Sequence, residues 1–356
     1  MPKAKKHYRS ARGEGIVIFP VTERGYGVAL KLIPFFEGAR AHAPQGLRRG
    51  GLARKVKDAF GRGSGLVFIG AAGIAVRMIA PHIKGKDVDP AVVVVDDGAR
   101  FAISLLSGHL GGANALAKEI ARAIGAVAVV TTATDTAGLP CAEDIAHRFH
   151  LAIENPGKIK AVNSAILRGG PVTVYDEDPK RLAAVKKAFS GAGVFRFERA
   201  GKDMAAAGAC VVISSAARTG YKGALVLRPR EFVVGVGCIK GVSEAEVEKA
   251  CKGVFSRGAL SLLSIRNLAT IDIKRREKGI TGYAEKIGAG VVFYGKEELL
   301  GVHPPSGPSS AVFESTGAFG VSEPAALLSS GAKRLWIKKV KAGMVTIAVA
   351  KAPFIS

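Results

Sequence analysis

Short apolar runs alternate with stretches of helical periodicity along most of this 356-residue chain, and this alternation limits the possible folds more than any other feature. Residues 66–69, the run AVVVVDD at 91–97 and residues 101–106 have the length and composition of strands, the last one buried. Several intervening stretches place apolar residues three and four positions apart, as helices do. The pattern predicts an α/β protein whose first sheet is largely parallel and covered by helices.

The length of the chain predicts more than one domain, because domains usually hold about 100–200 residues. We expect an N-terminal α/β domain over 1–137, a small middle α/β linker domain over 138–230 and a C-terminal α/β domain over 231–356. The middle segment lacks a polar loop motif comparable to those on either side. We therefore look for the chemistry in the two outer domains.

A large excess of positive charge limits the partners. The 52 Lys and Arg residues outnumber the 29 Asp and Glu residues, which gives a formal net charge of +23. Such a chain attracts polyanions, namely nucleic acid, phosphorylated metabolites or a small molecule with many carboxylates. The basic residues are scattered, and the chain has one Trp and no aromatic residues interleaved with Arg, which disfavours nucleic acid. A basic background without any partner explains the charge equally well.

The cysteines and the apolar runs indicate a cytoplasmic protein. The four cysteines stand far apart and form no CxxC pair, which argues against a zinc ribbon and a disulfide framework. The basic start MPKAKKHYRSARGEG leads into no apolar core of the signal-peptide type. No apolar stretch approaches the ~20 residues that a bilayer requires, so we expect no membrane contact.

The motif SGHLGGAN at 107–114 follows the strand at 101–106 and precedes a helix predicted over Ala113–Ile124. The amides at a helix N-terminus bind anions, and glycines let a ligand approach the backbone. His109 is a candidate acid–base residue because imidazole exchanges a proton near neutral pH. The alternative is an arrangement that only satisfies the backbone of the turn. The candidate substrate-binding residues of this motif are Ser107, Gly111, Gly112 and Asn114.

A second polar motif, TTATDT at 131–136, follows the next strand. In a parallel sheet it lies at the same edge as His109, where Thr134 could bind substrate and Asp135 could fix the imidazole. An ordinary turn stabilised by Thr and Asp side chains is the alternative.

Arg77 follows the small-residue turn GAAG at 70–73 and could bind a carboxylate, unless it is simply solvated on its helix.

The C-terminal third carries further polar loops. The run GVGCIKG at 235–241 has the spacing GxGxxxG, and no acidic residue clearly ends a following strand, so we reject a dinucleotide site. Arg266 and Lys274 lie in a segment rich in polar residues, and Thr316 and Glu323 lie near the start of a predicted helix. Glu323 is a candidate for proton transfer, or it complements the helix dipole.

Five of these segments together resemble the cobalt-precorrin-5A hydrolases of anaerobic cobalamin biosynthesis. They are LSGHLGGANALAKEIA, VVTTATD, GVGCIKGVS, LATIDIKRREKGI and TGAFGVSEPAAL, and the resemblance runs from about residue 65 to residue 352. It implies opening of a δ-lactone on the macrocycle with release of acetaldehyde, which gives cobalt-precorrin-5B. It also implies no cofactor, since the cobalt belongs to the substrate, and an anionic corrinoid partner. Transient contacts with neighbouring pathway enzymes are a further expectation.

We hypothesise that the macrocycle lies between the first and third units. His109 would activate water, Asp135 would orient His109 or carry a proton, and Glu323 is the second candidate for proton transfer. Arg77, Arg266 and Lys274 would bind carboxylates, and the amides around Gly111 and Gly112 would stabilise the oxyanion. Two rival functions are a protein that binds or channels corrinoid intermediates without turnover, and a nucleic-acid-binding module.

Overall fold

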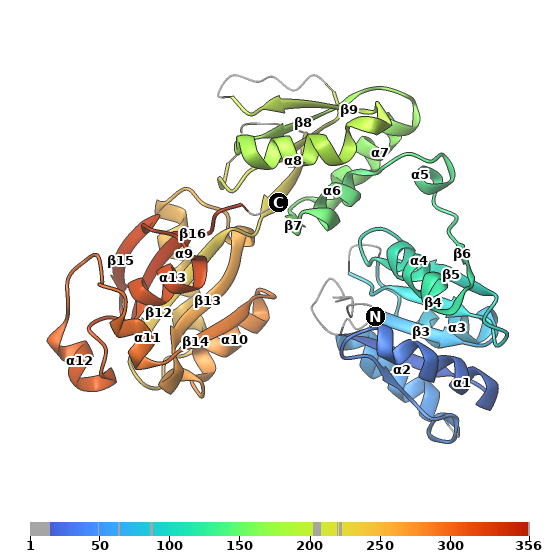
Figure 1. Cartoon of the computed structure of the whole chain (residues 1–356), viewed down its shortest axis with the longest axis horizontal. Coiled ribbons are helices and arrows are strands. Elements are labelled where there is room, and N and C mark those ends of the chain that lie inside the picture. The colour runs from blue at the N-terminus through green and yellow to red at the C-terminus, as the bar shows by residue number, and fades with distance from the viewer. Residues whose placement is uncertain are drawn as a thin grey trace. The chain divides into compact units, whose positions relative to one another are not determined.

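The computed structural model describes residues 15–48, 50–62, 65–85, 88–201, 208–218, 220 and 223–354. The basic start of the chain therefore lies outside the described residues. The fold is mixed α/β, with three sheets that follow one another along the chain (Figure 1). The chain divides into two compact units, Met1–Glu143 and Asp144–Ser356. The first unit contains one sheet and the second contains two.

The first sheet has six strands, and the predicted parallel arrangement holds for all neighbours except one pair. In spatial order the strands are β2 (Arg40–Ala41), β1 (Ile16–Pro20), β3 (Gly65–Ile69), β4 (Val92–Val95), β5 (Phe101–Leu106) and β6 (Val127–Val129). β5 is antiparallel to β4, because only five residues connect them and a parallel crossover needs a dozen or more. β5 and β6 therefore point opposite to the other four strands.

Helices cover both faces of this sheet. One face packs on α1 (Glu23–Leu32) and α4 (Ala113–Ile124), and the other on α2 (Gly51–Arg62) and α3 (Ala72–Ile79). The predicted strand at 101–106 is present, but it is only partly buried, since Ala102 alone is fully enclosed. α4 has its predicted bounds and ends at Gly125, whose φ of 72° is a left-handed conformation that glycine adopts without strain. Two short helices follow, α5 (Ala133–Thr136) and α6 (Ala142–Arg148).

The second sheet has five strands. In spatial order they are β7 (Leu151–Ile153), β11 (Leu225–Pro229), β10 (Cys210–Ile213), β8 (Val172–Asp176) and β9 (Phe195–Arg199), and only β7 is antiparallel to its neighbour. The helices of this region are α7 (Ile159–Leu167) and α8 (Pro179–Phe189). Asp178 caps α8 by accepting hydrogen bonds from the amides of Lys180 and Arg181.

The third sheet also has five strands. In spatial order they are β14 (Gly290–Tyr294), β13 (Ile265–Ile271), β12 (Phe232–Cys238), β16 (Val345–Lys351) and β15 (Ile337–Ala342). β12, β13 and β14 are parallel to one another, whereas the hairpin of β15 and β16 adds antiparallel strands beside β12. The helices of this region are α9 (Glu244–Arg257), α10 (Lys278–Lys286), α11 (Lys296–Leu300), α12 (Ser310–Thr316) and α13 (Ser322–Ser330).

The two faces of the third sheet are covered differently. α9 and α10 enclose the larger apolar core on one face, and the predicted capping box of Ser243 and Glu246 begins α9. On the other face α13 lies directly on β12. A Cβ atom at Gly235 would lie 1.7 Å from the carbonyl oxygen of Ser322, so only glycine permits this approach. The start of α13 is thereby fixed near the carboxyl end of β12.

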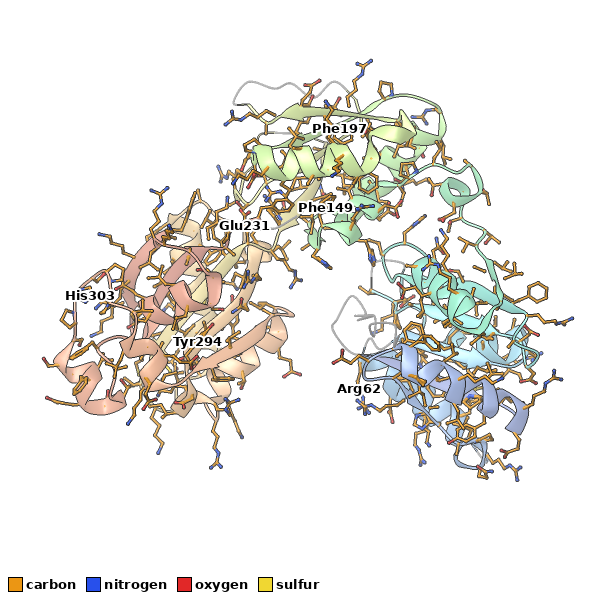
Figure 2. The ribbon with its side chains drawn as sticks, in the orientation of Figure 1. Arg62, Phe149, Phe197, Glu231, Tyr294 and His303 are labelled. Carbon is orange, nitrogen blue, oxygen red and sulfur yellow. The ribbon has the colours of Figure 1, made fainter. Side chains whose placement is uncertain are left out.

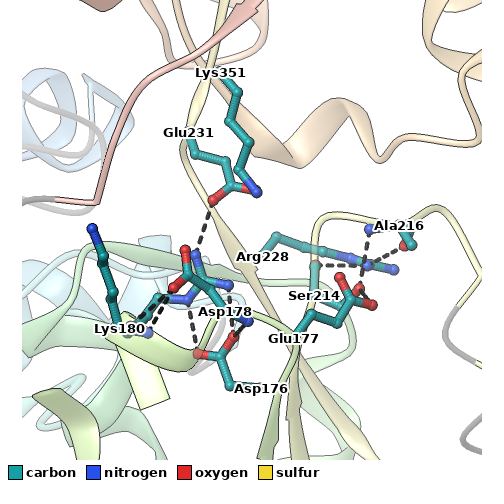
Figure 3. A network of polar contacts seen from close by, with 10 residues as sticks. Asp176, Glu177, Asp178, Lys180, Ser214, Ala216, Arg228, Glu231 and Lys351 are labelled. Carbon is teal, nitrogen blue, oxygen red and sulfur yellow. Dashed lines mark hydrogen bonds and ion pairs between the residues drawn. The ribbon is translucent and has the colours of Figure 1, made fainter. Parts of the chain in front are cut away.

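A buried ionic network joins the second and third sheets (Figure 3). Arg181 donates two hydrogen bonds to Asp176 and one, of 2.9 Å, to Glu231, which directly precedes β12. Lys351 at the end of β16 lies 3.0 Å from the other carboxylate oxygen of Glu231. The network therefore links α8 and β8 to the start of β12 and the end of β16 in the third sheet.

Among the residues that the model describes, no helix combines the length and the apolar character needed to cross a membrane.

Candidate functional site

Two groups of polar residues stand out, one in each compact unit. The first, here called the His109 cluster, surrounds the turn between β5 and α4 and consists of Ser104, His109, Asn114, Thr132, Thr134, Asp135 and Cys141. The second, here called the C-terminal cavity, lies at the carboxyl ends of β12 and β13. Each is described within its own unit.

The turn that carries His109 is tightly packed. Ser107 has a φ of 56° and Gly112 a φ of 86°, both in the left-handed region. A Cβ atom at Gly111 would lie 2.4 Å from the Cβ of Ser107, so a larger residue does not fit there. The amide of Gly112 donates to the carbonyl of His109 at 3.1 Å. The amide of Gly112 therefore already has a hydrogen-bond acceptor within the turn. The motif predicted instead that this amide would stabilise an oxyanion.

Asn114, in the first turn of α4, ties the two polar loops together. Its Nδ2 donates to Thr132 Oγ1 at 3.0 Å and to Asp135 Oδ2 at 2.9 Å, and its Oδ1 accepts from Ser104 Oγ at 2.7 Å. A Cβ atom at Gly108 would lie 2.6 Å from Asn114 Oδ1, which explains a glycine there. Asn114 is only 6% exposed, and both polar atoms of its buried amide have hydrogen-bond partners.

The imidazole of His109 lies against the second loop. Its Nε2 is 3.2 Å from Thr134 Oγ1 and 3.9 Å from Asp135 Oδ2, and its Nδ1 is 3.3 Å from the thiol of Cys141. The side chain keeps 18% of its surface exposed. Because β5 and β6 are parallel, the loops that follow them share one edge of the sheet, as the motif order predicts. Ser104 and Cys141 are the members of this group that sequence reasoning missed.

Asp135 carries the negative charge of the cluster. Burial acts to raise its pKa, but hydrogen bonds from Lys118 and Thr132 outweigh burial and hold the pKa below its usual value. Lys118 Nζ donates to Asp135 Oδ1 at 2.7 Å. An ionised carboxylate at neutral pH suits the orienting role considered for Asp135 better than the role of a proton carrier.

Arg77 lies apart from this arrangement. β3 points opposite to β5, so α3 begins at the sheet edge opposite the His109 turn. Arg77 is exposed in the last turn of α3. In the described part of the chain it makes no hydrogen bond or ion pair with the His109 cluster.

The C-terminal cavity has a volume of about 1320 Å³, above the range of about 300–1,000 Å³ that is usual for sites of drug-sized ligands. Its walls come from the glycine turn after β12, the turn after β13, the loop from β14 to α13, and the hairpin of β15 and β16. Figure 2 labels His303, which lies on the segment that leads from α11 to α12. Ligands commonly bind at the carboxyl ends of parallel strands.

The charged residues of the cavity are unequal in number. Two acidic residues, Glu277 and Glu323, line it, and six basic ones do: Lys240, Lys274, Arg276, Lys278, Lys339 and Lys341. Glu277 accepts hydrogen bonds from the amide of Gly241 at 3.0 and 3.1 Å and lies 3.6 Å from Lys274 Nζ. The cavity is therefore strongly basic and suits an anionic ligand.

Glu323, a candidate for proton transfer, is 1% exposed at the start of α13. Its carboxylate accepts from the amide and hydroxyl of Ser306 at 2.9 and 2.7 Å and from the amide of Lys339 at 2.9 Å. These bonds tie the 301–321 loop to β15. The geometry thus gives Glu323 a positioning role in the wall of the cavity.

The remaining predicted residues divide between two ends of the third sheet. Lys274 and Thr316 line the cavity, and the Thr316 hydroxyl donates to the carbonyl of Val312 at 2.7 Å. Arg266 lies near the amino end of β13, away from the cavity, where it donates to the carbonyl of Ser329 at 2.8 Å.

Cys238 lines the cavity, but burial raises the pKa of its thiol, which disfavours a nucleophilic thiolate.

Sequence reasoning missed the lysines of β15. Lys339 and Lys341 alternate along this strand and both line the cavity. The signal was present in the segment IKKVKA, because side chains two positions apart on a strand share a face.

Three models of known families match successive segments of the chain. They are described as cobalamin synthesis G N-terminal (54–135), cobalamin biosynthesis central region (142–229) and cobalamin synthesis G C-terminus (232–350). A protein of Priestia megaterium named cobalt-precorrin-5A hydrolase is 35% identical over 302 residues, which cover 82% of this chain and 79% of that protein. The chain belongs to the cobalamin synthesis G family.

Two further members of the cobalamin synthesis G family resemble it. A cobalt-precorrin-5A hydrolase of Salmonella typhimurium is 36% identical over 166 residues, 44% of this chain and 47% of that protein. The crystal structure of a cobalamin biosynthesis protein G homolog from Sulfolobus solfataricus covers 97% of this chain and 99% of its own, at 22% identity and a TM-score of 0.40. The family supports a hydrolase role in cobalamin biosynthesis.

Proposed function

We propose that this chain hydrolyses cobalt-precorrin-5A. Water opens the δ-lactone of the macrocycle, a two-carbon fragment leaves as acetaldehyde, and cobalt-precorrin-5B is formed. The name of the relatives supports this substrate. The observation on which the proposal rests most is the basic cavity of about 1320 Å³, which suits a large ligand with many carboxylates. The cobalt arrives with the substrate, so the proposed reaction requires no resident metal.

The cations of the cavity would bind the acetate and propionate groups of the substrate. Lys339 and Lys341 project from one strand and Lys274 from the turn after β13, so they approach a ligand from different walls. Charge-assisted hydrogen bonds to carboxylates are roughly twice as strong as neutral ones. Six basic residues outnumber two acidic ones in the lining, so the cavity keeps a net positive charge even though Glu277 lies 3.6 Å from Lys274 Nζ.

His109 is the proposed general base for the attacking water. Its imidazole is partly exposed, the Thr134 hydroxyl lies beside Nε2, and the ionised Asp135 stabilises the imidazolium that forms when the ring takes a proton. Asn114 holds Asp135 in place. A positioned base typically contributes about 10²–10⁴-fold to the rate.

Purified protein, cobalt-precorrin-5A and an assay for acetaldehyde test this function. We expect His109→Ala to lower kcat at least about a hundredfold with little change in KM. We expect the double variant K339A/K341A to raise KM about tenfold and to leave kcat nearly unchanged. His147→Ala, which changes an exposed histidine on α6, is the matched control and is expected to be fully active.

The outcomes separate the rival functions. Binding of the corrinoid without acetaldehyde from the wild-type protein would replace the hydrolase with a binding or channelling protein. Normal turnover in His109→Ala would remove His109 from the mechanism but not the activity. A steep salt-dependent affinity for random duplex DNA, with none for the corrinoid, would indicate the nucleic-acid-binding module.

We also propose that the reaction takes place in the cytoplasm. No disulfide joins the four cysteines, all of which lie within the described residues, as suits a reducing compartment.

A further inference from the structure

The C-terminal cavity combines its basic residues with exposed apolar side chains. Four large apolar residues that line it are 45–59% exposed: Ile239, Ile273, Phe319 and Met344. Ile239 and Met344 are neighbours, since the amide of Ile239 donates to the carbonyl of Met344 at 3.3 Å. Exposed apolar side chains that gather in one cavity commonly mark a binding site. Their position inside a basic cavity indicates a ligand with both an apolar surface and several negative charges.

Phe319 is the aromatic member of this set, and a second ring supports it. The rings of Phe313 and Phe319 are stacked, with centroids 4.7 Å apart and an interplanar angle of 19°. Phe313 is itself 43% exposed, so burial in the protein core does not account for the pair. Two parallel rings offer a flat, apolar surface that a planar ligand can extend by a third layer.

The backbone around this pair is fixed before any ligand binds. The amide of Ser309 donates to the carbonyl of Phe319 at 3.0 Å, and the amide of Ala318 donates to Thr316 Oγ1 at 3.2 Å. Ala318 is fully buried, and Glu323 holds Ser306 at the start of the same loop. A rigid loop loses little conformational entropy on binding, so the contact area of Phe319 is available for affinity.

The cations line the same cavity as the apolar side chains. Lys339 and Lys341 lie on one face of β15, and the amide of Lys339 is bonded to the same Glu323 carboxylate that fixes the loop. The two kinds of contact are therefore linked through one buried residue. A small inorganic anion would use only the lysines, and an uncharged aromatic molecule would use only the rings.

We propose that Phe319, supported by Phe313, is a platform on which a flat macrocycle lies while Lys339 and Lys341 bind its peripheral carboxylates. Phe319 is then a residue that selects planar polyanions over other polyanions. The identity of the macrocycle as a corrinoid rests on the proposed function, but the class of ligand does not.

Uroporphyrin, a planar ring with eight carboxylates, and inositol hexakisphosphate, a polyanion without a planar apolar face, are the probes. Fluorescence titration and calorimetry give their affinities for the full chain. We expect Phe319→Ala to weaken uroporphyrin about tenfold and to change inositol hexakisphosphate less than twofold. We expect K339A/K341A to weaken both. Phe35→Ala, at a phenylalanine that is 40% exposed in the other unit, is the matched control and is expected to weaken neither.

Three results would overturn the platform: no binding of uroporphyrin by the wild-type protein, an unchanged affinity in Phe319→Ala, or an equal loss for both probes. Phe319→Leu, with circular dichroism, guards against misfolding, because it keeps the apolar volume but removes the flat ring. Acetaldehyde release is measured separately on the same variants. Loss of selectivity for planar probes with intact turnover would refute the platform alone, whereas selective binding without any turnover would refute only the hydrolase.

Discussion

In the His109 cluster the polar side chains form hydrogen bonds with one another, whereas in the C-terminal cavity the polar side chains line an open space. Asn114 alone makes three side-chain hydrogen bonds, and these join two loops in a small and mostly buried volume. The cavity has six basic side chains around about 1320 Å³, and its two carboxylates are used to build its walls. The first arrangement suits the fixing of a reactive group, and the second suits the capture of a large charged ligand.

Both regions depend on glycines that permit a close approach, but the approaches differ in what they bring together. Gly235 lets α13 lie directly on β12 and so places Ser322, which lines the cavity. Gly108 makes room for one side chain, Asn114. The comparison predicts that changes to backbone packing cost more than changes to a side-chain contact. Substitutions at Gly235 and Gly108 test whether the losses of stability follow this order. Changes of salt and pH then test the two regions in other ways.

The largest effect is expected for Gly235→Ala. The new Cβ would lie 1.7 Å from the carbonyl oxygen of Ser322, and this backbone atom cannot move without shifting α13. We expect a loss of at least about 3 kcal/mol in the opening free energy of β12 and α13, measured by hydrogen exchange. Gly237→Ala is the control, because its Cβ would have no neighbour closer than 3.8 Å. Equal protection in both variants would show that α13 is not fixed by this contact.

A smaller loss, of about 2 kcal/mol, is expected for Gly108→Ala. Its Cβ would lie 2.6 Å from Oδ1 of Asn114, whose side-chain amide is held in place by one hydrogen bond to Oδ1 and two from Nδ2. Asn114→Ala alone is expected to cost about 2 kcal/mol, because it leaves buried groups without partners.

The double variant G108A/N114A tests the coupling between these two positions. Once the amide is removed the clash disappears, so we expect the double variant to be more stable than the sum of the single losses by about 2 kcal/mol. Opening free energies of α4 from hydrogen exchange give the cycle. Strict additivity would mean that Gly108 is needed for its backbone conformation and not for space.

A change of salt concentration distinguishes the contributions of the two regions to catalysis without any mutation. Raising the ionic strength from about 0.05 to about 0.5 M screens the charges of the open cavity, and we expect KM for the corrinoid to rise about tenfold. The groups around His109 are in hydrogen-bond contact, so kcat is expected to change less than twofold. Acetaldehyde release at a series of salt concentrations measures both constants. A fall in kcat with an unchanged KM would reverse the roles that we assign to the two regions.

Most of the His109 cluster, though not Ser104 or Cys141, could be predicted from the sequence because it depends on the order of neighbouring strands and loops. Two successive strands, each followed by a polar loop, bring His109 and Asp135 to one sheet edge once β5 and β6 are parallel. The reversal of β5 against β4 was not anticipated, although five residues between the two strands are too few for a crossover. That reversal separates the start of α3, and with it Arg77, from the His109 turn.

The residues of the cavity were harder to predict from the sequence, because the walls of the cavity come from four segments that are far apart along the chain. Lys274 and Thr316 were recognised on local motifs. Lys339 and Lys341 line the cavity only because β16 pairs with β12 and β15 pairs with β16. Glu323 was recognised as a carboxylate near a helix start. Its bonds to Ser306 and Lys339 depend on contacts far along the chain, which spacing alone does not indicate.

The smallest effect is expected from acid, and it depends on Asp135. Lys118 and Thr132 hold the pKa of Asp135 below its usual value in the folded protein. Its contribution to stability is therefore present above the pKa of the unfolded chain and is lost as the pH falls through the lower, folded pKa. Between about pH 5 and pH 3, α4 and α5 should lose more protection against hydrogen exchange in the wild-type protein than in Asp135→Asn. Lys118→Met is the companion variant, since it removes the bond to Asp135 Oδ1 but keeps the carboxylate. If the wild-type protein and Asp135→Asn lose protection in parallel, the carboxylate does not sense its neighbours, and the His109 cluster is less tightly coupled than its hydrogen bonds indicate.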